Sequence, residues 1–259
     1  MDLTIDSKLI YEKIIKFISS SFKKSGFSQA VIGLSGGIDS AVSLTLAAQA
    51  LEKENIYPYI LPFGDLNSIG VEDAKLLINH LTIPFDHLTI INIKPLVDPI
   101  ISLDNSIDDI RKGNIMARMR MILLMDAAKK RNALVVGTEN KTEHVLGYYT
   151  RFGDEASDVE PIQSLYKTQV RELATYLGIP KKIIAASPTA GLWEGQTDEG
   201  EFGFTYEEAD QILYLKFEKH LSEEEIVKKR FKREVVGKVL GRVKVNEFKK
   251  NLPMVFITE

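Results

Sequence analysis

The sequence predicts an α/β fold, doubly wound, with a mostly parallel sheet that is flanked by helices and followed by a helical C-terminal region. Apolar runs of strand length alternate with apolar patterns of helical spacing, as in right-handed βαβ units. The clearest unit is residues 29–44, where an apolar run ends in small residues and a helical pattern starts at once. From residue 205 onward the pattern is helical throughout. In such sheets, ligands bind at the carboxyl ends of the strands.

The first half of the chain supplies most of the expected sheet. Residues 6–24 carry an apolar stripe of helical spacing and are expected to form a covering helix. Residues 30–34 form a continuous apolar run, typical of a buried strand, and a helix is expected from residue 38. The same criteria then predict a strand at 56–62, a helix at 71–81 and a strand at 87–93.

The second half is expected to complete the sheet and then to turn helical. Pro95 and Pro99 are expected to bound a short irregular segment, followed by a small helix at 100–110. Thr205 and Ser222 each begin a capping box, the pattern of a helix start. The remaining predicted elements are a helix at 116–130, a strand at 133–137 and a helix at 168–177 that ends at Gly178 and Pro180.

The composition is that of an ordinary globular protein. Its 259 residues, 44% of them hydrophobic, are enough for one large core, so we expect a single domain over residues 1–259. The formal net charge of -3 gives no drive toward nucleic acid or anionic membrane, and neither is expected as a partner. No apolar run has transmembrane length and the N-terminus lacks signal-peptide features, so a cytoplasmic protein is expected.

Cysteine is absent from the sequence. The chain therefore has no disulfide, thiolate metal site or cysteine nucleophile. Any amide nitrogen that it installs has to come from free ammonia or from a partner subunit, because glutamine-fed synthetases use a Cys-dependent amidotransferase.

The turn between the first expected strand and its helix is suited to hold phosphate. Gly36 and Gly37 allow successive N–H groups to point into one concavity, to which the helix adds its free N-terminal N–H groups. The turn is not a Walker loop, because no Lys stands at the helix start. Asp39 stands there instead, and an acid beside phosphate makes sense when a divalent cation bridges the two. The alternative is a plain turn with Asp39 as a helix-start residue.

The string Ser-Gly-Gly-Ile-Asp-Ser at residues 35–40, placed after a strand, resembles the pyrophosphate-binding loop of the N-type ATP pyrophosphatases. Members of that class cleave ATP between its α and β phosphates. The resemblance implies a Rossmann-like fold, transfer of AMP, and pyrophosphate held in the loop.

A second informative stretch, residues 137–154, follows the strand expected at 133–137. The ends of neighbouring parallel strands lie side by side, so Thr138 and Glu143 are expected near the loop at 35–40. Glu143 is then a candidate second carboxylate for the cation held by Asp39. The alternative is that Glu143 is only a polar residue on a short helix.

The pattern Gly-Thr-x-Asn-x-Thr-Glu-x-x-x-Gly-Tyr-x-Thr-x-x-Gly-Asp in residues 137–154 closely resembles the signature of NAD synthetases. The resemblance continues through Asp158, Pro161 and Lys167 to residues 188–199. The length matches the short, ammonia-dependent type, whose glutamine-dependent relatives carry an extra amidohydrolase domain.

The resemblance implies ATP-dependent amidation of deamido-NAD by ammonia, with Mg²⁺, in a homodimer that binds the dinucleotide at the subunit interface. The ATP-binding residues that it implies are Gly33, Leu34, Ser35, Gly36, Gly37, Ile38, Asp39, Ser40, Thr138, Lys167 and Thr189. The implied metal ligands are Asp39 and Glu143. The residues implied to contact deamido-NAD are Arg118, Arg151, Asp158 and Lys249, with Asp154 as the catalytic residue near the carboxylate that is amidated.

The chain departs from the family pattern at three places, the first being Thr142, where many members have Ser. Near the C-terminus many members have a His followed by a Lys; here Lys249 matches the Lys, but Phe248 stands in place of the His. Residues 155–157 stand where glycine is common in the family. Residues 187–203 are rich in Gly, Thr and acids, and we expect a lid there, with an ordinary surface loop as the alternative. The helix at 115–124 is a candidate dimer face, although a core helix explains its Met residues equally well.

Two other functions stay open at the level of sequence. The first is another adenylating synthetase with the same loop, such as a GMP-synthetase ATPase subunit. The second is a regulator that holds ATP without turnover. Asp39 and Glu143 argue against the regulator, because a passive binder needs no pair of cation ligands.

Overall fold

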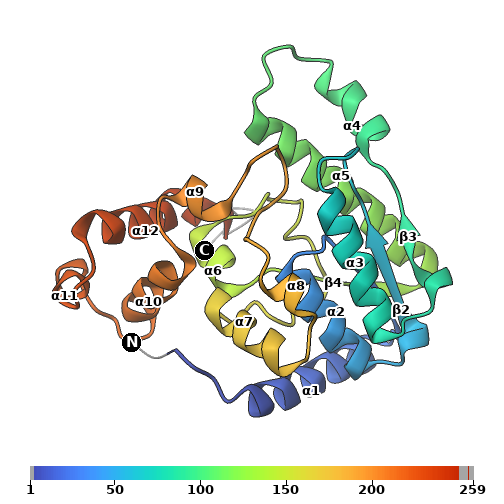
Figure 1. Cartoon of the computed structure of the whole chain (residues 1–259), viewed down its shortest axis with the longest axis horizontal. Helices are drawn as coiled ribbons and strands as arrows, with labels where there is room; N and C mark the ends of the chain where they lie inside the picture. The colour runs from blue at the N-terminus through green and yellow to red at the C-terminus, as the bar shows by residue number, and fades with distance from the viewer. Residues whose placement is uncertain (1–2, 251–255, 257–259) are drawn as a thin grey trace.

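The computed structural model of the chain describes residues 3–250 and residue 256. At its centre is a four-stranded sheet in the order β3-β2-β1-β4, with every neighbouring pair parallel. In Figure 1 helices surround the sheet and the C-terminal helices pack to one side of it. The parallel α/β fold and the helical C-terminal region are therefore confirmed.

Most expected elements form within a few residues of their predicted bounds. The strands are β1 (Gln29–Gly33), β2 (Ile56–Ile60), β3 (Thr89–Ile90) and β4 (Ala133–Val136). The helices before the C-terminal region are α1 (Ser7–Ser25), α2 (Ile38–Ala50), α3 (Ser68–Leu81), α4 (Lys94–Ile101), α5 (Asp109–Arg131), α6 (Lys141–Leu146), α7 (Lys167–Tyr176) and α8 (Lys181–Ile184). Then come α9 (Asp198–Phe202), α10 (Tyr206–Phe217), α11 (Glu223–Lys228) and α12 (Arg233–Asn246). Short 3-10 turns lie at Lys53–Asn55, Phe85–His87 and Glu247–Lys249.

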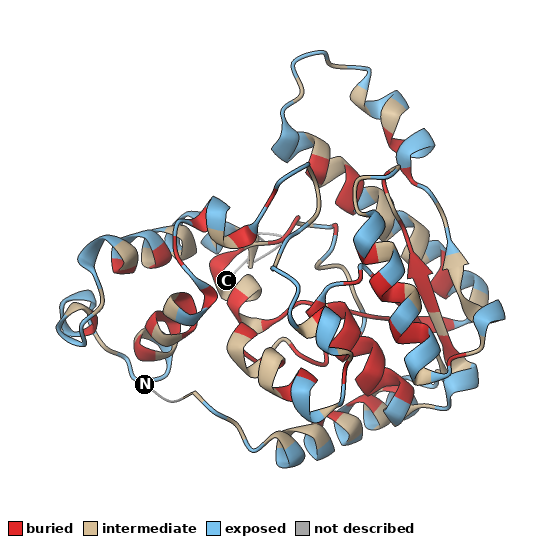
Figure 2. Ribbon diagram, viewed as in Figure 1, coloured by how far each residue is buried: buried red, intermediate tan, exposed pale blue. Residues whose placement is uncertain are grey.

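The sheet is covered on both faces, which is why its strands are apolar throughout. Ala30 and Ile32 of β1 belong to the core cluster shared with α1, α2, α3 and α7. Val31, which points to the opposite face, belongs to the cluster beneath α4 and α5. Figure 2 shows these buried residues as the red interior of the ribbon. The sheet is thus doubly wound, as the sequence predicts.

The C-terminal helices pack around a core cluster of their own. Tyr206 is fully buried there with residues of α10, α11 and α12, and Leu146 of α6 joins them. Thr205 and Ser222 form the two capping boxes that the sequence predicts. Helix α10 contacts α6 and α7, so it lies against the elements that follow β4. That the whole chain is one domain stays a prediction.

The structure differs from four expectations between residues 87 and 131. The strand expected at 87–93 is reduced to Thr89–Ile90, and the helix expected at 100–110 is wrong, because α4 lies earlier. Pro95 starts α4 rather than bounding an irregular segment, since a proline in the first turn has no N–H to lose. Asp108 caps α5 by accepting a hydrogen bond from Arg111 N, so α5 begins before residue 116.

None of the helices within residues 3–250 is both long and apolar enough to span a membrane.

Candidate active site

The Gly-rich loop between β1 and α2 lies at the carboxyl edge of the sheet, where β1 sits between β2 and β4. The Oγ atoms of Ser35 and Ser40 lie 3.1 Å apart, and Ser40 Oγ donates to Gly37 O at 3.0 Å. The N–H groups of Ser35 and Gly37 donate to these hydroxyls, so they are satisfied inside the loop. Helix α2 starts without a side-chain cap. The free N–H groups at the N-terminus of α2 are therefore the backbone donors that this loop offers to an anion.

Gly36 has to be glycine for two reasons. Its φ of +86° lies in the left-handed region, and a Cβ atom there would lie 2.1 Å from Gly70 O of α3. Asn67 holds α3 in this position, because its Nδ2 donates to Ser35 O and its Oδ1 accepts from Gly70 N. The start of α3 is thus packed directly against the loop.

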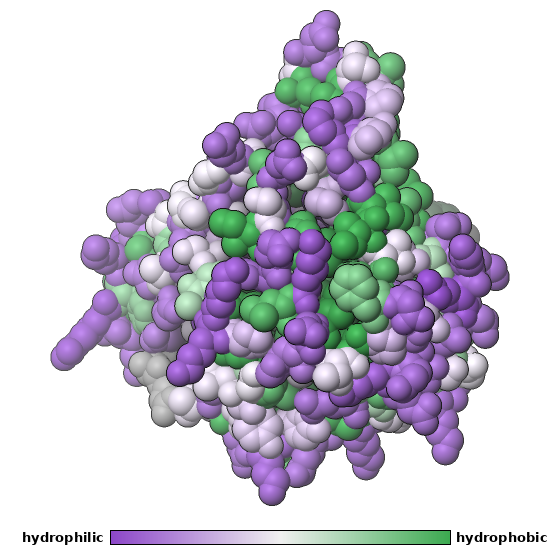
Figure 3. All heavy atoms as spheres, turned by 45° about the vertical axis from the view of Figure 1, so that its right-hand side comes forward, coloured by the Kyte–Doolittle hydropathy of each residue, from purple (hydrophilic) through white to green (hydrophobic). Residues whose placement is uncertain are grey.

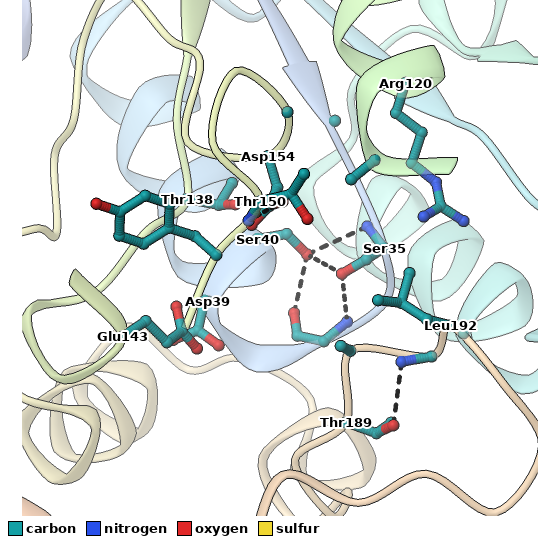
Figure 4. A pocket seen from close by; sticks show the side chains of 18 of the residues that line it. Ser35, Asp39, Ser40, Arg120, Thr138, Glu143, Thr150, Asp154, Thr189 and Leu192 are labelled. Atoms are coloured by element: carbon teal, nitrogen blue, oxygen red, sulfur yellow. Dashed lines mark hydrogen bonds between the residues drawn. The ribbon is translucent and has the colours of Figure 1, made fainter. Parts of the chain in front are cut away.

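Beside the loop, a buried lysine joins two carboxylates that the sequence places far apart. Lys167 Nζ lies 2.5 Å from Asp39 Oδ2 and 3.3 Å from Glu143 Oε1. Figure 4 shows the Asp39 and Glu143 side chains converging below Ser40. We call Asp39, Glu143 and Lys167 the acid–lysine cluster. Its members come from α2, α6 and α7, so only the tertiary fold assembles it.

The electrostatics of the acid–lysine cluster keep the lysine charged. Burial alone would lower the pKa of Lys167, but Asp39 and Glu143 raise it above its usual range. Burial raises the pKa of Glu143 to about 8, against the lowering effect of Lys167. The cluster therefore holds one protonated lysine between two carboxyl groups, and burial disfavours the charged form of one of them, Glu143.

The Asp39 and Glu143 carboxylates fit the donor set of Mg²⁺. Within the described part of the chain, no group of three or more His, Cys, Asp or Glu side chains is arranged to hold a metal. Mg²⁺ is usually held by only one or two carboxylates together with substrate phosphates, because it keeps several oxygen ligands from outside the protein. Two carboxylates next to a phosphate loop satisfy that requirement.

A cavity of about 920 Å³ opens over the loop and the acid–lysine cluster. Thr138, Asp154, Thr189 and Lys249 all line it, together with Lys167. The ATP-binding residues expected from the sequence, residues 33–40 included, thus border one space. A cavity of this size can take a nucleotide.

The residues expected to contact deamido-NAD divide into two groups. Lys249 lines the cavity, whereas Arg118, Arg151 and Asp158 are not among the described residues that line it. Asp158 Oδ2 accepts from Val135 N at 2.7 Å, so it holds the edge of β4. Arg118 Nε donates to Arg151 O at 3.2 Å.

Arg151 and Phe248, the residue that replaces the family His, meet outside the cavity. The Arg151 guanidinium lies 5.5 Å from the Phe152 ring centre and 5.6 Å from that of Phe248. A guanidinium over an aromatic face is a cation–π contact. Phe248 therefore supplies an aromatic surface at this rim.

Asp154 and Lys249 are each fixed by backbone groups of the segment after α6. Thr150 N donates to Asp154 Oδ1 at 2.9 Å. The Asp154 side chain faces the cavity, and protein surrounds the rest of it. This burial removes water from the carboxyl group and raises its pKa. Lys249 Nζ donates to Gly147 O and Tyr149 O, and burial lowers its pKa.

Sequence reasoning missed two buried residues of the site. Asn140 is fully buried and its Nδ2 donates to Asp39 Oδ1 at 2.9 Å. It also caps α6 in a capping box with Glu143, so Glu143 is both a helix residue and a site residue. The helix-cap rule could have identified Asn140 as a helix start. Asp198 lies in the stretch 188–199 that resembles the family, but the resemblance assigned it no role. It is 3% exposed and accepts from the hydroxyls of Tyr148 and Tyr206.

A buried acid near β4 gives a prediction for the pH dependence of stability. Burial raises the pKa of Glu160 to about 8 from its ordinary 4.5, and its Oε2 has no hydrogen-bond partner among the described residues. Between these values the native state binds more protons than the unfolded chain, so stability falls as pH rises from about 4.5 to about 8. Glu160→Gln should therefore raise Tm by about 4 °C at pH values above about 8.

Thermal unfolding at several pH values tests this expectation. The gain from Glu160→Gln should disappear below about pH 4.5, where both states are protonated. The exposed Glu54→Gln serves as the control and should shift Tm little at any pH. A gain of equal size at low and high pH would contradict the assignment.

The parallel sheet, the Gly-rich loop after β1 and the acid–lysine cluster together define an ATP-binding α/β protein of the ATP pyrophosphatase class. A family model described as NAD synthase matches residues 10–253. The chain belongs to the NAD synthase family.

Three relatives illustrate the similarity. The NH3-dependent NAD(+) synthetase of Fusobacterium nucleatum subsp. nucleatum is 42% identical over 253 residues, which cover 98% of this chain and 97% of that protein. The solved NH3-dependent NAD synthetase from Campylobacter jejuni has a TM-score of 0.82 at 33% identity, covering 98% of this chain and 100% of that one. The solved NMN synthetase from Francisella tularensis has a TM-score of 0.85 at 34% identity, with coverages of 97% and 98%.

Proposed function

We infer that this chain catalyses the ATP-dependent amidation of deamido-NAD to NAD, with ammonia as the nitrogen donor. The observation that carries the inference is the acid–lysine cluster beside the Gly-rich loop, in a chain that matches ammonia-dependent NAD synthetases over nearly its full length. A carboxylate does not acylate an amine unaided, so the reaction needs the adenylation for which such a site is suited.

In the first step the nicotinate carboxylate of deamido-NAD attacks the α-phosphorus of ATP. The bond from that phosphorus to the oxygen bridging to the β-phosphorus breaks, and pyrophosphate leaves with the bonding electron pair. We propose that the loop at 35–40 and the N-terminus of α2 bind the departing anion, which the uncapped start of α2 and the buried positive charge of Lys167 support. Mg²⁺, held by Asp39 and Glu143, would add charge neutralisation there.

In the second step ammonia attacks the acyl carbon, the bond from that carbon to the AMP oxygen breaks, and AMP leaves with its electron pair. The nitrogen loses one proton to water to give the neutral amide. Asp154 lines the cavity, and its raised pKa suits a carboxylate that binds ammonium and accepts the proton that ammonium loses. The acyl adenylate has to be kept from water during this step, and residues 187–203 are suited to do so as a lid.

The proposed lid gives a prediction for limited proteolysis. Residues 187–203 are held together locally, since Thr189 Oγ1 donates to Gln196 O and Leu192 N donates to Gln196 Oε1. Thr189 and Leu192 line the cavity, so bound nucleotide should order this segment from inside. Cleavage within 187–203 should slow about ten-fold when ATP and deamido-NAD are both present. Equal cleavage with and without the substrates would contradict a lid, and cleavage in the exposed segment 217–220, which does not line the cavity, serves as the reference.

The homodimer is proposed from an exposed apolar surface on α4 and α5. Figure 3 shows apolar side chains gathered on this face, below the projecting tip of the molecule. The exposed apolar residues of this region are Leu96, Ile100, Leu103, Ile110 and Ile122. Met116 is fully buried, so α5 serves both the core and the proposed interface. Sedimentation should give a dimer at micromolar concentration, and a monomer would remove the proposal.

The experiment that tests the function measures pyrophosphate and NAD with ATP, Mg²⁺ and ammonium. Deamido-NAD should support release of both products in equal amounts, and xanthylate should support neither. Because the Francisella structure is named NMN synthetase, nicotinate mononucleotide is assayed as a second acceptor. A higher kcat/KM with nicotinate mononucleotide than with deamido-NAD would reassign the acceptor. ATP binding without turnover of any acceptor would support the regulator instead.

A further inference from the structure

One charged side chain in the cavity has no role in the reaction as described so far. Arg120 lies in the middle of α5, which packs against β1 and β4, and it lines the cavity. Figure 4 shows its side chain pointing from α5 into the cavity. Its Nε donates to Leu61 O, just beyond β2, at 3.0 Å. The guanidinium is therefore anchored through Nε, and its two terminal nitrogens make no hydrogen bond to the described residues.

The charge of Arg120 is not neutralised by a neighbouring acid. Among the described residues, no carboxylate lies within 4.0 Å of its nitrogens, whereas Arg111 on the same helix pairs with Asp104. Burial lowers the pKa of Arg120 to about 10, and Asp154 offsets this only in part. A buried, unpaired cation lowers the free energy of unfolding. An anionic ligand that paired with Arg120 would offset this loss.

The position of Arg120 narrows the choice of anion. In the proposed reaction the β- and γ-phosphates are bound by the loop, the start of α2 and Lys167, so these anions do not need Arg120. Leu61 follows β2, the strand beside β1, so the anchored guanidinium lies one strand away from the loop. A nucleotide whose diphosphate sits in the loop and whose nucleoside extends toward β2 would bring its α-phosphate past this side chain. If the neutral adenine base lay beside Arg120 instead, the positive charge of the guanidinium would stay unpaired.

We propose that Arg120 binds the α-phosphoryl group of ATP, and keeps hold of it as the phosphate of the acyl adenylate and then of AMP. The proposal rests on the adenylating function inferred above. A planar guanidinium with two free terminal nitrogens can bind two oxygens of one phosphate at once. Arg120 thus keeps the AMP part of the acyl adenylate in place after pyrophosphate leaves. It also neutralises the phosphate of AMP when ammonia displaces AMP.

Binding of AMP and adenosine separates this role from a general effect on the pocket. The two ligands differ by the one phosphate that Arg120 is proposed to contact. Titration calorimetry should show that Arg120→Gln weakens AMP binding at least about ten-fold, because a charge-assisted contact is lost. Adenosine binding should change less than about three-fold. Arg120→Lys, which keeps the charge but loses the fork, should weaken AMP binding by an intermediate factor.

The control is Arg111→Gln on the same helix, which should leave both affinities unchanged. Equal weakening of AMP and adenosine by Arg120→Gln would overturn the proposal, since it would indicate a structural role. Unchanged AMP binding would also overturn it, because the guanidinium would then serve another group, such as the nicotinate carboxylate. No acyl acceptor is present in this experiment, so its outcome is independent of whether deamido-NAD is the substrate.

Discussion

Asp39→Asn should lower pyrophosphate release in the presence of ATP, Mg²⁺, deamido-NAD and ammonium by at least about 100-fold. The asparagine keeps the size of the side chain and an oxygen that can accept from Asn140 Nδ2. It removes the negative charge that we propose holds Mg²⁺ next to the loop. Initial rates of pyrophosphate release over a range of Mg²⁺ concentrations give the measurement. Loss of the metal ligand should also make the remaining rate depend on higher Mg²⁺.

The fold should survive this substitution, because Lys167 still has Glu143 as a partner. Asp109→Asn is the matched control, since Asp109 is also an acid in the first turn of a helix but lies on the exposed start of α5. The control should keep parental activity. Full activity in Asp39→Asn at ordinary Mg²⁺ would refute the metal role of Asp39.

Lys167→Met should destabilise the free protein by about 3 kcal/mol or more, because removing one partner of a buried ion pair leaves the other charge uncompensated. Lys167 is 3% exposed, while Asp39 and Glu143 keep side-chain exposures of 16% and 17%. Without the lysine, two carboxyl groups face each other. Urea unfolding gives the loss of stability. Activity should also fall at least about 100-fold, since the buried positive charge beside the phosphates is gone.

Two further measurements separate electrostatics from packing. Mg²⁺ should stabilise Lys167→Met more than it stabilises the parent, because a cation can replace the lost ammonium between the carboxylates. The double variant Lys167→Met with Asp39→Asn should be less destabilised than the sum of the single variants. Lys181→Met on the exposed start of α8 is the control. Additive losses and no added effect of Mg²⁺ would contradict the account of the acid–lysine cluster.

The sequence was sufficient for the fold class because burial on both faces leaves a clear pattern. The apolar run that became β1 and the helical pattern of α2 needed no tertiary information. The elements within residues 87–110 were predicted less well, because the local sequence there is compatible with more than one secondary structure. Pro95 is compatible with both a break and a helix start, and only the structure decides between them.

The candidate site was predictable where a motif fixes neighbours along the chain, and less so where the fold brings distant residues together. The loop at 35–40 and Glu143 could be identified from motifs. The contact between Asp39 and Lys167 joins residues 128 positions apart, and no local pattern indicates that the lysine lies between two acids. Arg120 could not be told from a solvated helix arginine, because its role depends on which way the side chain points.

The central claim is that a carboxylate-anchored cation and the Gly-rich loop together hold the phosphates that leave ATP. Crystals grown with ATP and Mn²⁺ in place of Mg²⁺ test it, since the anomalous signal locates the metal directly. We predict an anomalous peak bound by Asp39 and Glu143, with the β- and γ-phosphates against residues 35–40. A metal bound away from both carboxylates, or a triphosphate out of reach of the Gly36–Gly37 turn, would contradict the account.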